Sequence, residues 1–221
     1  MTARLRLALL LLSLPLTAQA QDAAPAAPAG GPVSYALAGG TALHVRVYKD
    51  PSTVAAGLSH DHAIASTQHN GTVTYDPANP AACAISVTVP VAGLDPDPDA
   101  LRQKVGLPGV LEASARAEIK EHMLDAEQLN AKAFPTITFV STSCAASGDQ
   151  VKVAGTLTIR GKAQPVSLNM KVKADAAGFS ASGSLPIKAT QFGFQPFSAL
   201  LGALKNKDEM TLVVNLAGKP R

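Results

Sequence analysis

Apolar and polar residues alternate with a period of two along most of the chain from residue 33 onward. In "PVSLNMKVKA" the residues Val166, Leu168, Met170 and Val172 take one face, and polar residues lie between them. Similar alternation begins near residues 43, 85, 137, 151, 179 and 210. Because successive side chains of a β-strand point to opposite faces, this pattern predicts strands with one buried face.

Turn sequences separate the alternating runs. They include "YDPANP", "SGDQ", "RGKAQP" and "ADAAG", which are rich in residues that favour tight turns. About eight short strands at this spacing predict an all-β chain folded as an antiparallel sandwich or barrel. A closed barrel leaves no strand edge open to aggregation, which favours the barrel.

Residues 95–133 break the alternation and contain many helix-forming residues. The first piece is "DALRQK", with Asp99 expected as its N-cap, and the second is "VLEASARAEIKEHMLDAEQLNAKA", with Pro135 just beyond its end. We therefore expect a helical excursion between two strands, packed over one end of the barrel.

The first 20 residues predict export. Arg4 and Arg6 precede the apolar run "LALLLLSLPL", and the A-x-A pattern of residues 18–20 follows it. These are the features of a signal peptide, and the run is too short to span a bilayer. Residues 21–32 form an Ala/Pro/Gly linker, which leaves residues 33–221 as one barrel domain. We expect the protein in the periplasm, or secreted if the cell has no outer membrane.

The net charge and the absence of basic and long apolar runs exclude some classes of function. Removal of the signal peptide takes away Arg4 and Arg6, so the formal net charge falls from +3 to +1. Because no basic patch with interleaved aromatic residues follows, nucleic-acid binding is not expected, and no later run is long enough for a membrane helix.

Cys83 and Cys144 would lie level if their strands pair antiparallel. In an oxidising compartment a disulfide between them is favoured over two buried thiols.

Common catalytic arrangements do not occur. The sequence lacks a nucleophile elbow, a phosphate-binding loop and a C-x-x-C pair. Ser59, His60 and Asp61 are consecutive, so in a strand they would alternate between faces and could not form a triad. The acidic run "DPDPD" lacks the spacing of a calcium loop and is interpreted as turn-forming and helix-capping aspartates. We expect no enzymatic activity and no cofactor.

Several long stretches resemble the YceI-like family. They are "NGTVTYDPANPAACAISVTVPVAGLD", "HMLDAEQLNAKAFPTITFVST", "VAGTLTIRGKAQPVSLNMKV" and "IKATQFGF", and the resemblance covers nearly all of residues 35–218. It implies an exported, lipocalin-like antiparallel barrel that binds a polyisoprenoid, quinone or related lipid in an internal tunnel. The chain departs from the family pattern in the long segment between Gly93 and His122 and in the stretch "SHDH".

An apolar lumen agrees with this implication. The chain has no Trp and only six Phe, so the inward faces carry mostly aliphatic side chains that leave space for a slim ligand. The apolar loop "FGFQPFSALLGAL" either lines the entrance or packs a minor core. Together with the histidines considered next, the residues expected to contact ligand are Val87, Val89, Phe139, Leu157, Ile159, Leu168, Met170, Ile187, Phe192, Phe194, Phe197 and Leu200.

His60 and His62 carry the remaining candidate chemistry. In a strand they would share one face with Leu58 and Ile64, about 6.6 Å apart along the chain. The favoured interpretation is that both imidazoles face the mouth of the lumen and bind the polar head of a lipid. One alternative is a metal-dependent protein built on this pair, with a third ligand from His44, His69 or His122, although His44 has the phase of an outward side chain. The other is a pair of exposed residues without a special role.

A different class of function also stays open. A barrel whose lumen is filled by its own side chains would act as a structural or interaction module, and self-association into a homodimer is compatible with the sequence.

Overall fold

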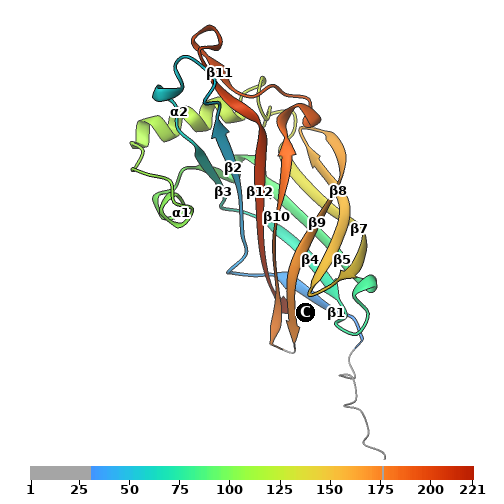
Figure 1. Cartoon of the computed structure of the whole chain (residues 1–221). Helices are drawn as coiled ribbons and strands as arrows, with labels where there is room; N and C mark the ends of the chain where they lie inside the picture. The colour runs from blue at the N-terminus through green and yellow to red at the C-terminus, as the bar shows by residue number, and fades with distance from the viewer. Residues whose placement is uncertain (1–30, 176) are drawn as a thin grey trace, which may run out of the picture.

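The computed structural model describes residues 31–175 and 177–221. The predicted signal peptide and all but two residues of the predicted linker lie outside this range, and the first strand begins at Val33. Within the described residues, no helix is long and apolar enough to cross a membrane. The chain forms a tall, mostly β structure with two helices on one side (Figure 1).

Eight antiparallel strands close into a barrel. The closing contacts are made by the first strand, which pairs with one neighbour through Tyr35 and Val73 and with the last strand through Leu37 and Gly218. The predicted lipocalin-like barrel is therefore confirmed. In order around the barrel, the strands are β1 (Val33–Leu37), β4 (Asn70–Tyr75), β5 (Ala84–Pro90), β7 (Thr136–Ser147), β8 (Gln150–Ile159), β9 (Lys162–Asp175), β10 (Gly178–Lys188) and β12 (Leu204–Pro220).

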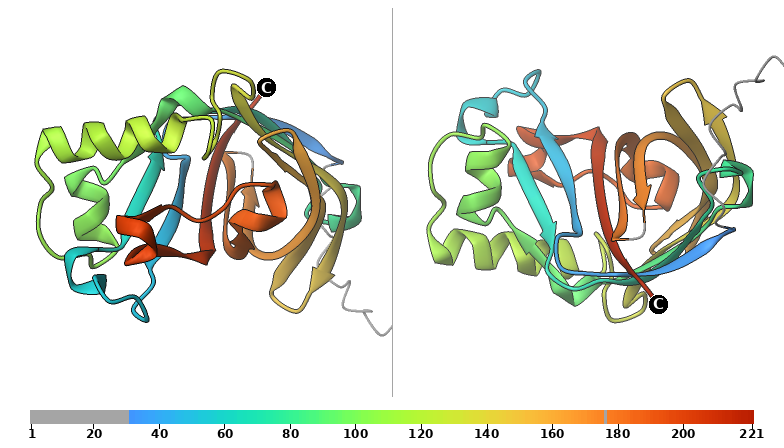
Figure 2. Two further views of the ribbon diagram at one scale, coloured as in Figure 1. Left: turned by 90° about the horizontal axis from the view of Figure 1, so that it is seen from above. Right: turned by 90° about the horizontal axis from the view of Figure 1, so that it is seen from below.

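Three further strands extend from the barrel, and we call them the wing: β2 (Ala42–Lys49), β3 (His62–Ser66) and β6 (Leu94–Pro96). The long strand β12 carries both parts, because its last residues pair with β1 while Leu212 pairs with Val45 of β2. Figure 2 shows β2 and β3 on one side of β12 and the strands β7 to β9 on the other. The wing and the strands β7 to β9 thus lie on opposite sides of β12.

The two-residue alternation places apolar side chains inside, as predicted. In β8, Val151, Val153, Leu157 and Ile159 are buried, and the neighbouring β9 buries Leu168 and Met170. The main core includes Tyr35 of β1, and a second cluster includes Phe192 in the 3₁₀ turn that follows β10. Each cluster consists of residues that strands far apart in the sequence bring together.

The helical excursion is shorter than the sequence suggests. Helix α1 (Asp99–Lys104) has Pro98 at the cap position, so Asp99 is its first residue and the predicted N-cap is wrong. The carboxylate still favours this end, because the helix dipole is positive there. Helix α2 (Ala113–Leu124) ends nine residues before Ala133, since the chain turns after Asp125 and reaches a left-handed backbone at Asn130, φ 48°.

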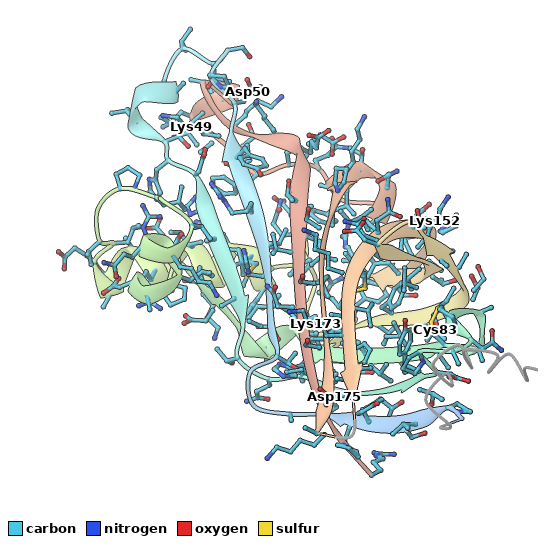
Figure 3. The ribbon with its side chains drawn as sticks, turned by 60° about the horizontal axis from the view of Figure 1, so that its bottom comes forward. Lys49, Asp50, Cys83, Lys152, Lys173 and Asp175 are labelled. Atoms are coloured by element: carbon cyan, nitrogen blue, oxygen red, sulfur yellow. A yellow bond between two sulfur atoms is a disulfide. The ribbon has the colours of Figure 1, made fainter. Side chains whose placement is uncertain are left out.

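Two contacts tie distant segments to the barrel. The predicted disulfide joins Cys83, just before β5, to Cys144 in β7, with 5.9 Å between the Cα atoms (Figure 3). Arg116 of α2 donates from Nη2 to both carboxylate oxygens of Asp95 and from Nε to the carbonyl oxygen of Pro96. The second contact fixes α2 against strand β6 of the wing.

Candidate binding cavity

An apolar cavity of about 200 Å³ lies between the wing and the inner face of the barrel. Strands β2, β3, β5, β7, β8, β9, β10 and β12 all contribute to its wall. Among the lining residues only His44, Ser66 and Thr138 have polar side chains. A wall of this composition offers a ligand dispersion and hydrophobic contact but almost no hydrogen bonds.

Most of the apolar residues expected to contact ligand line this cavity. Phe139 is the single aromatic residue among the lining residues, so aliphatic side chains leave the interior open. A Cβ atom at Gly155 would lie 2.6 Å from the Phe139 ring, so the glycine lets that ring lie close against strand β8. The eight expected residues found at the wall are Val87, Val89, Phe139, Leu157, Ile159, Leu168, Met170 and Ile187.

A second hollow of about 140 Å³ adjoins the first, and we call it the rim hollow. The two spaces share Val47, Ile64, Met123 and Met210 in their walls, so they lie side by side. Polar side chains of the rim hollow are those of His62, His122, Gln128, Asn206 and Lys207. The molecule therefore places an almost entirely apolar space next to one whose wall is mostly apolar but carries five polar side chains.

The remaining expected contact residues lie in different places. His62, Phe194 and Phe197 line the rim hollow. Phe192, His60 and Leu200 line neither space. Phe192 is fully buried in the second apolar cluster, whereas Leu200 is 62% exposed on the loop that follows β11 (Ser198–Ala199).

The region around His60 is not the strand that alternation predicts. Residues Ala56–Leu58 form a 3₁₀ turn, strand β3 begins only at His62, and Leu58 is 77% exposed. His62 keeps the predicted phase with Ile64, since both line the rim hollow. Asp61 points away, and its Oδ1 accepts a hydrogen bond from the backbone N–H of Lys49.

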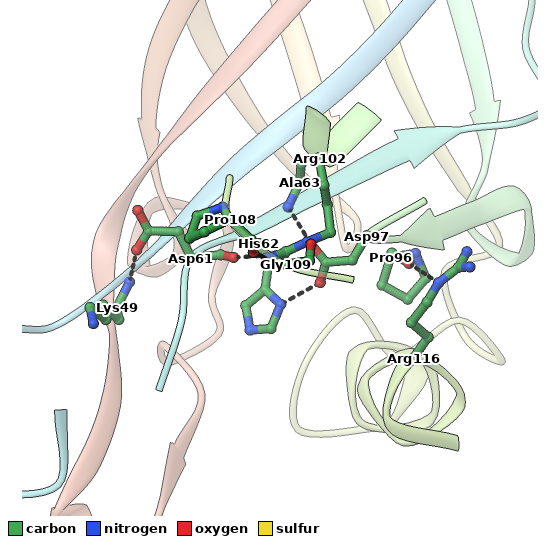
Figure 4. Close-up of polar contacts among 10 residues, drawn as sticks. All are labelled: Lys49, Asp61, His62, Ala63, Pro96, Asp97, Arg102, Pro108, Gly109 and Arg116. Atoms are coloured by element: carbon green, nitrogen blue, oxygen red, sulfur yellow. Dashed lines mark hydrogen bonds and ion pairs between the residues drawn. The ribbon is translucent and has the colours of Figure 1, made fainter. Parts of the chain in front are cut away.

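Asp97 is the polar residue of this region that sequence reasoning missed. Its side chain is fully buried, and Nδ1 of His62 donates to its Oδ2 at 2.6 Å (Figure 4). Its Oδ1 accepts the backbone N–H of Ala63 and Nη1 of Arg102, both at 2.9 Å. A run of turn-forming and helix-capping aspartates does not predict this buried role, and the one signal in the sequence is an aspartate between two prolines.

The hydrogen bonds to Asp97 favour the charged form of its carboxyl group. Burial alone would raise the pKa of a carboxyl group, but the hydrogen bonds from the three partners outweigh it, so the pKa of Asp97 lies below its usual value. Burial, and then the nearby imidazole of His62, lower the pKa of His60. The two histidine rings lie 4.6 Å apart between centroids.

Among the described residues, one histidine–carboxylate group could hold a metal ion. His60, His62 and Asp97 each offer a ligand atom, and these atoms lie within 4.8 Å of one another. None of His44, His69 and His122, the third ligands considered from sequence, belongs to this group.

Comparison with known sequences identifies relatives. Residues 46–217 match the YceI-like domain model. Two curated proteins named Protein YceI, from Salmonella arizonae and Salmonella newport, are each 32% identical over 127 residues. The alignment covers 54% of this chain, which spans 57% of the length of these relatives.

Solved structures show the same architecture. BcnA of Burkholderia cenocepacia has 24% sequence identity and a TM-score of 0.58, covering 79% of this chain and 95% of BcnA. The YCEI protein of Campylobacter jejuni has 17% identity and a TM-score of 0.54, covering 72% and 84% of the two chains. At these identities the two structures support the barrel fold alone.

Proposed function

The chain belongs to the YceI-like family, and on this premise we propose that it is an exported, non-catalytic carrier of one isoprenoid-like lipid. Family and fold together support a protein that binds a hydrophobic ligand. The proposal adds the class of ligand, which is a polyprenyl or quinone-type chain, and the compartment, which is the periplasm. The disulfide between Cys83 and Cys144 supports an oxidising compartment.

The observation that carries the proposal is the apolar cavity beside a hollow that carries polar side chains. A chain in the cavity would gain about 0.8 kcal/mol for each buried CH₂-sized group, before the cost of ordering it. The branched aliphatic wall suits a slim, methyl-branched chain better than a flat aromatic ligand, which needs wider planar contact. The open interior also argues against a barrel filled by its own side chains.

The rim hollow would hold the head group. Asn206 and Gln128 offer amide groups, His62 and His122 offer imidazoles, and Lys207 offers a positive charge. A quinone carbonyl, a hydroxyl or a prenyl phosphate would each find a hydrogen-bond donor there. Because the hollow shares residues with the cavity, one ligand could occupy both.

Binding of defined chains tests the proposal. Purified protein would be titrated with a farnesyl-chain alcohol and with a straight-chain alcohol of equal carbon number, and complexes counted by native mass spectrometry. We expect 1:1 binding and a preference for the isoprenoid. Equal binding of both alcohols would contradict the proposed ligand class, and binding of neither would contradict the carrier function.

A matched pair of variants tests whether the ligand lies in this cavity. Val214→Phe adds a ring to the cavity wall, whereas Val140→Phe makes the same change at a residue that is 52% exposed on β7. We expect at least tenfold weaker binding in Val214→Phe and unchanged binding in Val140→Phe. Equal affinity of the two variants would show that the chain does not lie in this cavity.

A further inference from the structure

We propose that His60, His62 and Asp97 form a binding site for one divalent transition-metal ion of the zinc type, which we call the rim metal site. This site differs from the lipid cavity in its chemistry, and the proposal does not rest on the proposed lipid function. Only His62 is shared, because it also lines the rim hollow.

The three side chains are already close to the spacing that an ion requires. One ligand atom of each lies within 4.8 Å of the others, and Nδ1 of His62 lies 2.6 Å from Oδ2 of Asp97. In a tetrahedral zinc site with bonds of about 2.1 Å, ligand atoms lie about 3.4 Å apart. Small side-chain rotations would therefore admit an ion, which takes the place of the proton between His62 and Asp97.

The side chain of Asp97 is already oriented to act as a metal ligand. The N–H of Ala63 and the guanidinium of Arg102 both bind its Oδ1, which leaves Oδ2 directed at His62 (Figure 4). Pro96 and Pro98 flank the residue and restrict its backbone, which adopts the uncommon φ of 53°. A ligand fixed in this way loses little conformational entropy when an ion binds.

His60 supplies the adjustable ligand. It is exposed, and it makes no hydrogen bond to the described part of the chain that would have to break. Its ring is 4.6 Å from that of His62 between centroids, with the planes tilted by 58°. Rotation about its side-chain bonds can therefore bring a ring nitrogen to the ion without moving the strand.

The donor set selects the class of metal. Two imidazoles and one carboxylate suit Zn²⁺ and the neighbouring ions Co²⁺, Ni²⁺ and Cu²⁺, whereas Mg²⁺ and Ca²⁺ require more oxygen ligands. The positive charge of Arg102, 2.9 Å from Oδ1 of Asp97, opposes the ion and lowers its affinity. We expect an exchangeable ion with a coordination position open to water, since His60 lies at the surface.

Zinc titration of untagged protein tests the site. Isothermal titration calorimetry with Zn²⁺ should show one equivalent bound, while Mg²⁺ at the same concentration should show none. His60→Ala is the decisive variant, because this residue is exposed and makes no hydrogen bond to the described part of the chain, and we expect at least tenfold weaker binding. His69→Gln, which changes a histidine outside the group, should bind zinc as the wild type does.

Asp97→Asn tests the third ligand with little change in shape. If the variant remains folded by circular dichroism, we expect at least tenfold weaker zinc binding. Folded Asp97→Asn with wild-type affinity would contradict the assigned ligand set. If the variant does not fold, the visible absorption spectrum of the wild type with Co²⁺ reports the ligand geometry instead. A spectrum of tetrahedral or five-coordinate type that disappears in His60→Ala supports the site. Absence of zinc binding in the wild type, or unchanged binding in His60→Ala, would overturn the proposal.

Discussion

Asp97 and Arg102 form a buried ion pair that joins three segments of the wing side. Arg102 is 3% exposed and donates to the carbonyl oxygens of Asp61, Pro108 and Gly109 as well as to Asp97. A buried charge that loses its partner retains the cost of its lost hydration. The pair therefore supports both the fold of this region and the position of His62.

Removal of the Asp97 carboxylate should destabilise the protein strongly. We expect Asp97→Ala to lower the free energy of unfolding by about 3–5 kcal/mol, because Arg102 remains buried and unpaired. Asp95→Ala breaks the more exposed pair with Arg116 and should cost no more than about 1 kcal/mol. Urea unfolding of both variants measures the difference, and similar losses would contradict the role given to the buried pair.

His44 should make the fold sensitive to mild acid. Burial, and then the positive charges of Lys104 and Arg46, lower the pKa of His44 below its usual 6.5. The unfolded chain then binds a proton more readily than the folded one, so His44 favours folding fully above pH 6.5 and less as the pH falls below it. Asp97, whose pKa is also lowered, acts in the same direction only below about pH 3.8.

The free energy of unfolding, measured at two pH values, tests whether His44 destabilises the fold as the pH falls. The wild type should lose more free energy of unfolding between about pH 7.5 and pH 5.5 than the variant His44→Gln, which cannot gain the proton. Equal losses in the two proteins would show that His44 does not resist protonation in the folded state.

At the level of single residues, the sequence predicted partners that are close together along the chain but not partners that meet across strands. His60 and His62 were visible as a pair because they are neighbours in the chain. Asp97 is 35 residues from His62, and the two meet only because β3 pairs with β6. Such a meeting depends on strand pairing over a long distance, which alternation within each strand does not determine.

Among the elements, strands were predicted better than the segments between them. The alternation in β8 and β9 reflects burial of one face, so it gave the correct phase. The same alternation from Leu58 to Ile64 was misleading, because apolar residues of an exposed turn can match a period of two by chance. Helix α2 ended early because local turns after Asp125 competed with helix propensity.

The loop after β11 holds two leucines in a left-handed backbone conformation. Leu200 and Leu201 have φ values of 51° and 55°, and Leu201 is fully exposed. This conformation costs a residue with a side chain about 1–2 kcal/mol, whereas glycine adopts it freely. The strain in this loop therefore has little packing to offset it at Leu201.

Replacement of Leu201 by glycine should leave stability unchanged or raise it by up to about 1 kcal/mol, since relief of strain exceeds the entropy that glycine adds to the unfolded chain. Val54→Gly, at a residue that is 93% exposed with an ordinary backbone conformation, should lower stability by about 0.5–1 kcal/mol. Thermal and urea unfolding would compare the two variants. A greater loss in Leu201→Gly than in Val54→Gly would contradict this account of the loop.

In the whole molecule, the closed barrel and the wing together create the binding space. The count of about eight strands could be predicted from turn spacing, and the closure between β1 and β12 agrees with it. The wing could not be predicted, because it requires that β12 pair with β1 at one end and with β2 at the other. That arrangement opens the cavity beside the barrel wall and gives it a polar rim.

The most direct test of the carrier function is the lipid content of the protein itself. Protein purified from its native compartment would be extracted with organic solvent, and the extract analysed by mass spectrometry. We predict one isoprenoid class at nearly one molecule per chain, and at least tenfold less in Val214→Phe. An extract without lipid, from a protein that also takes up no isoprenoid when it is supplied, would contradict the account.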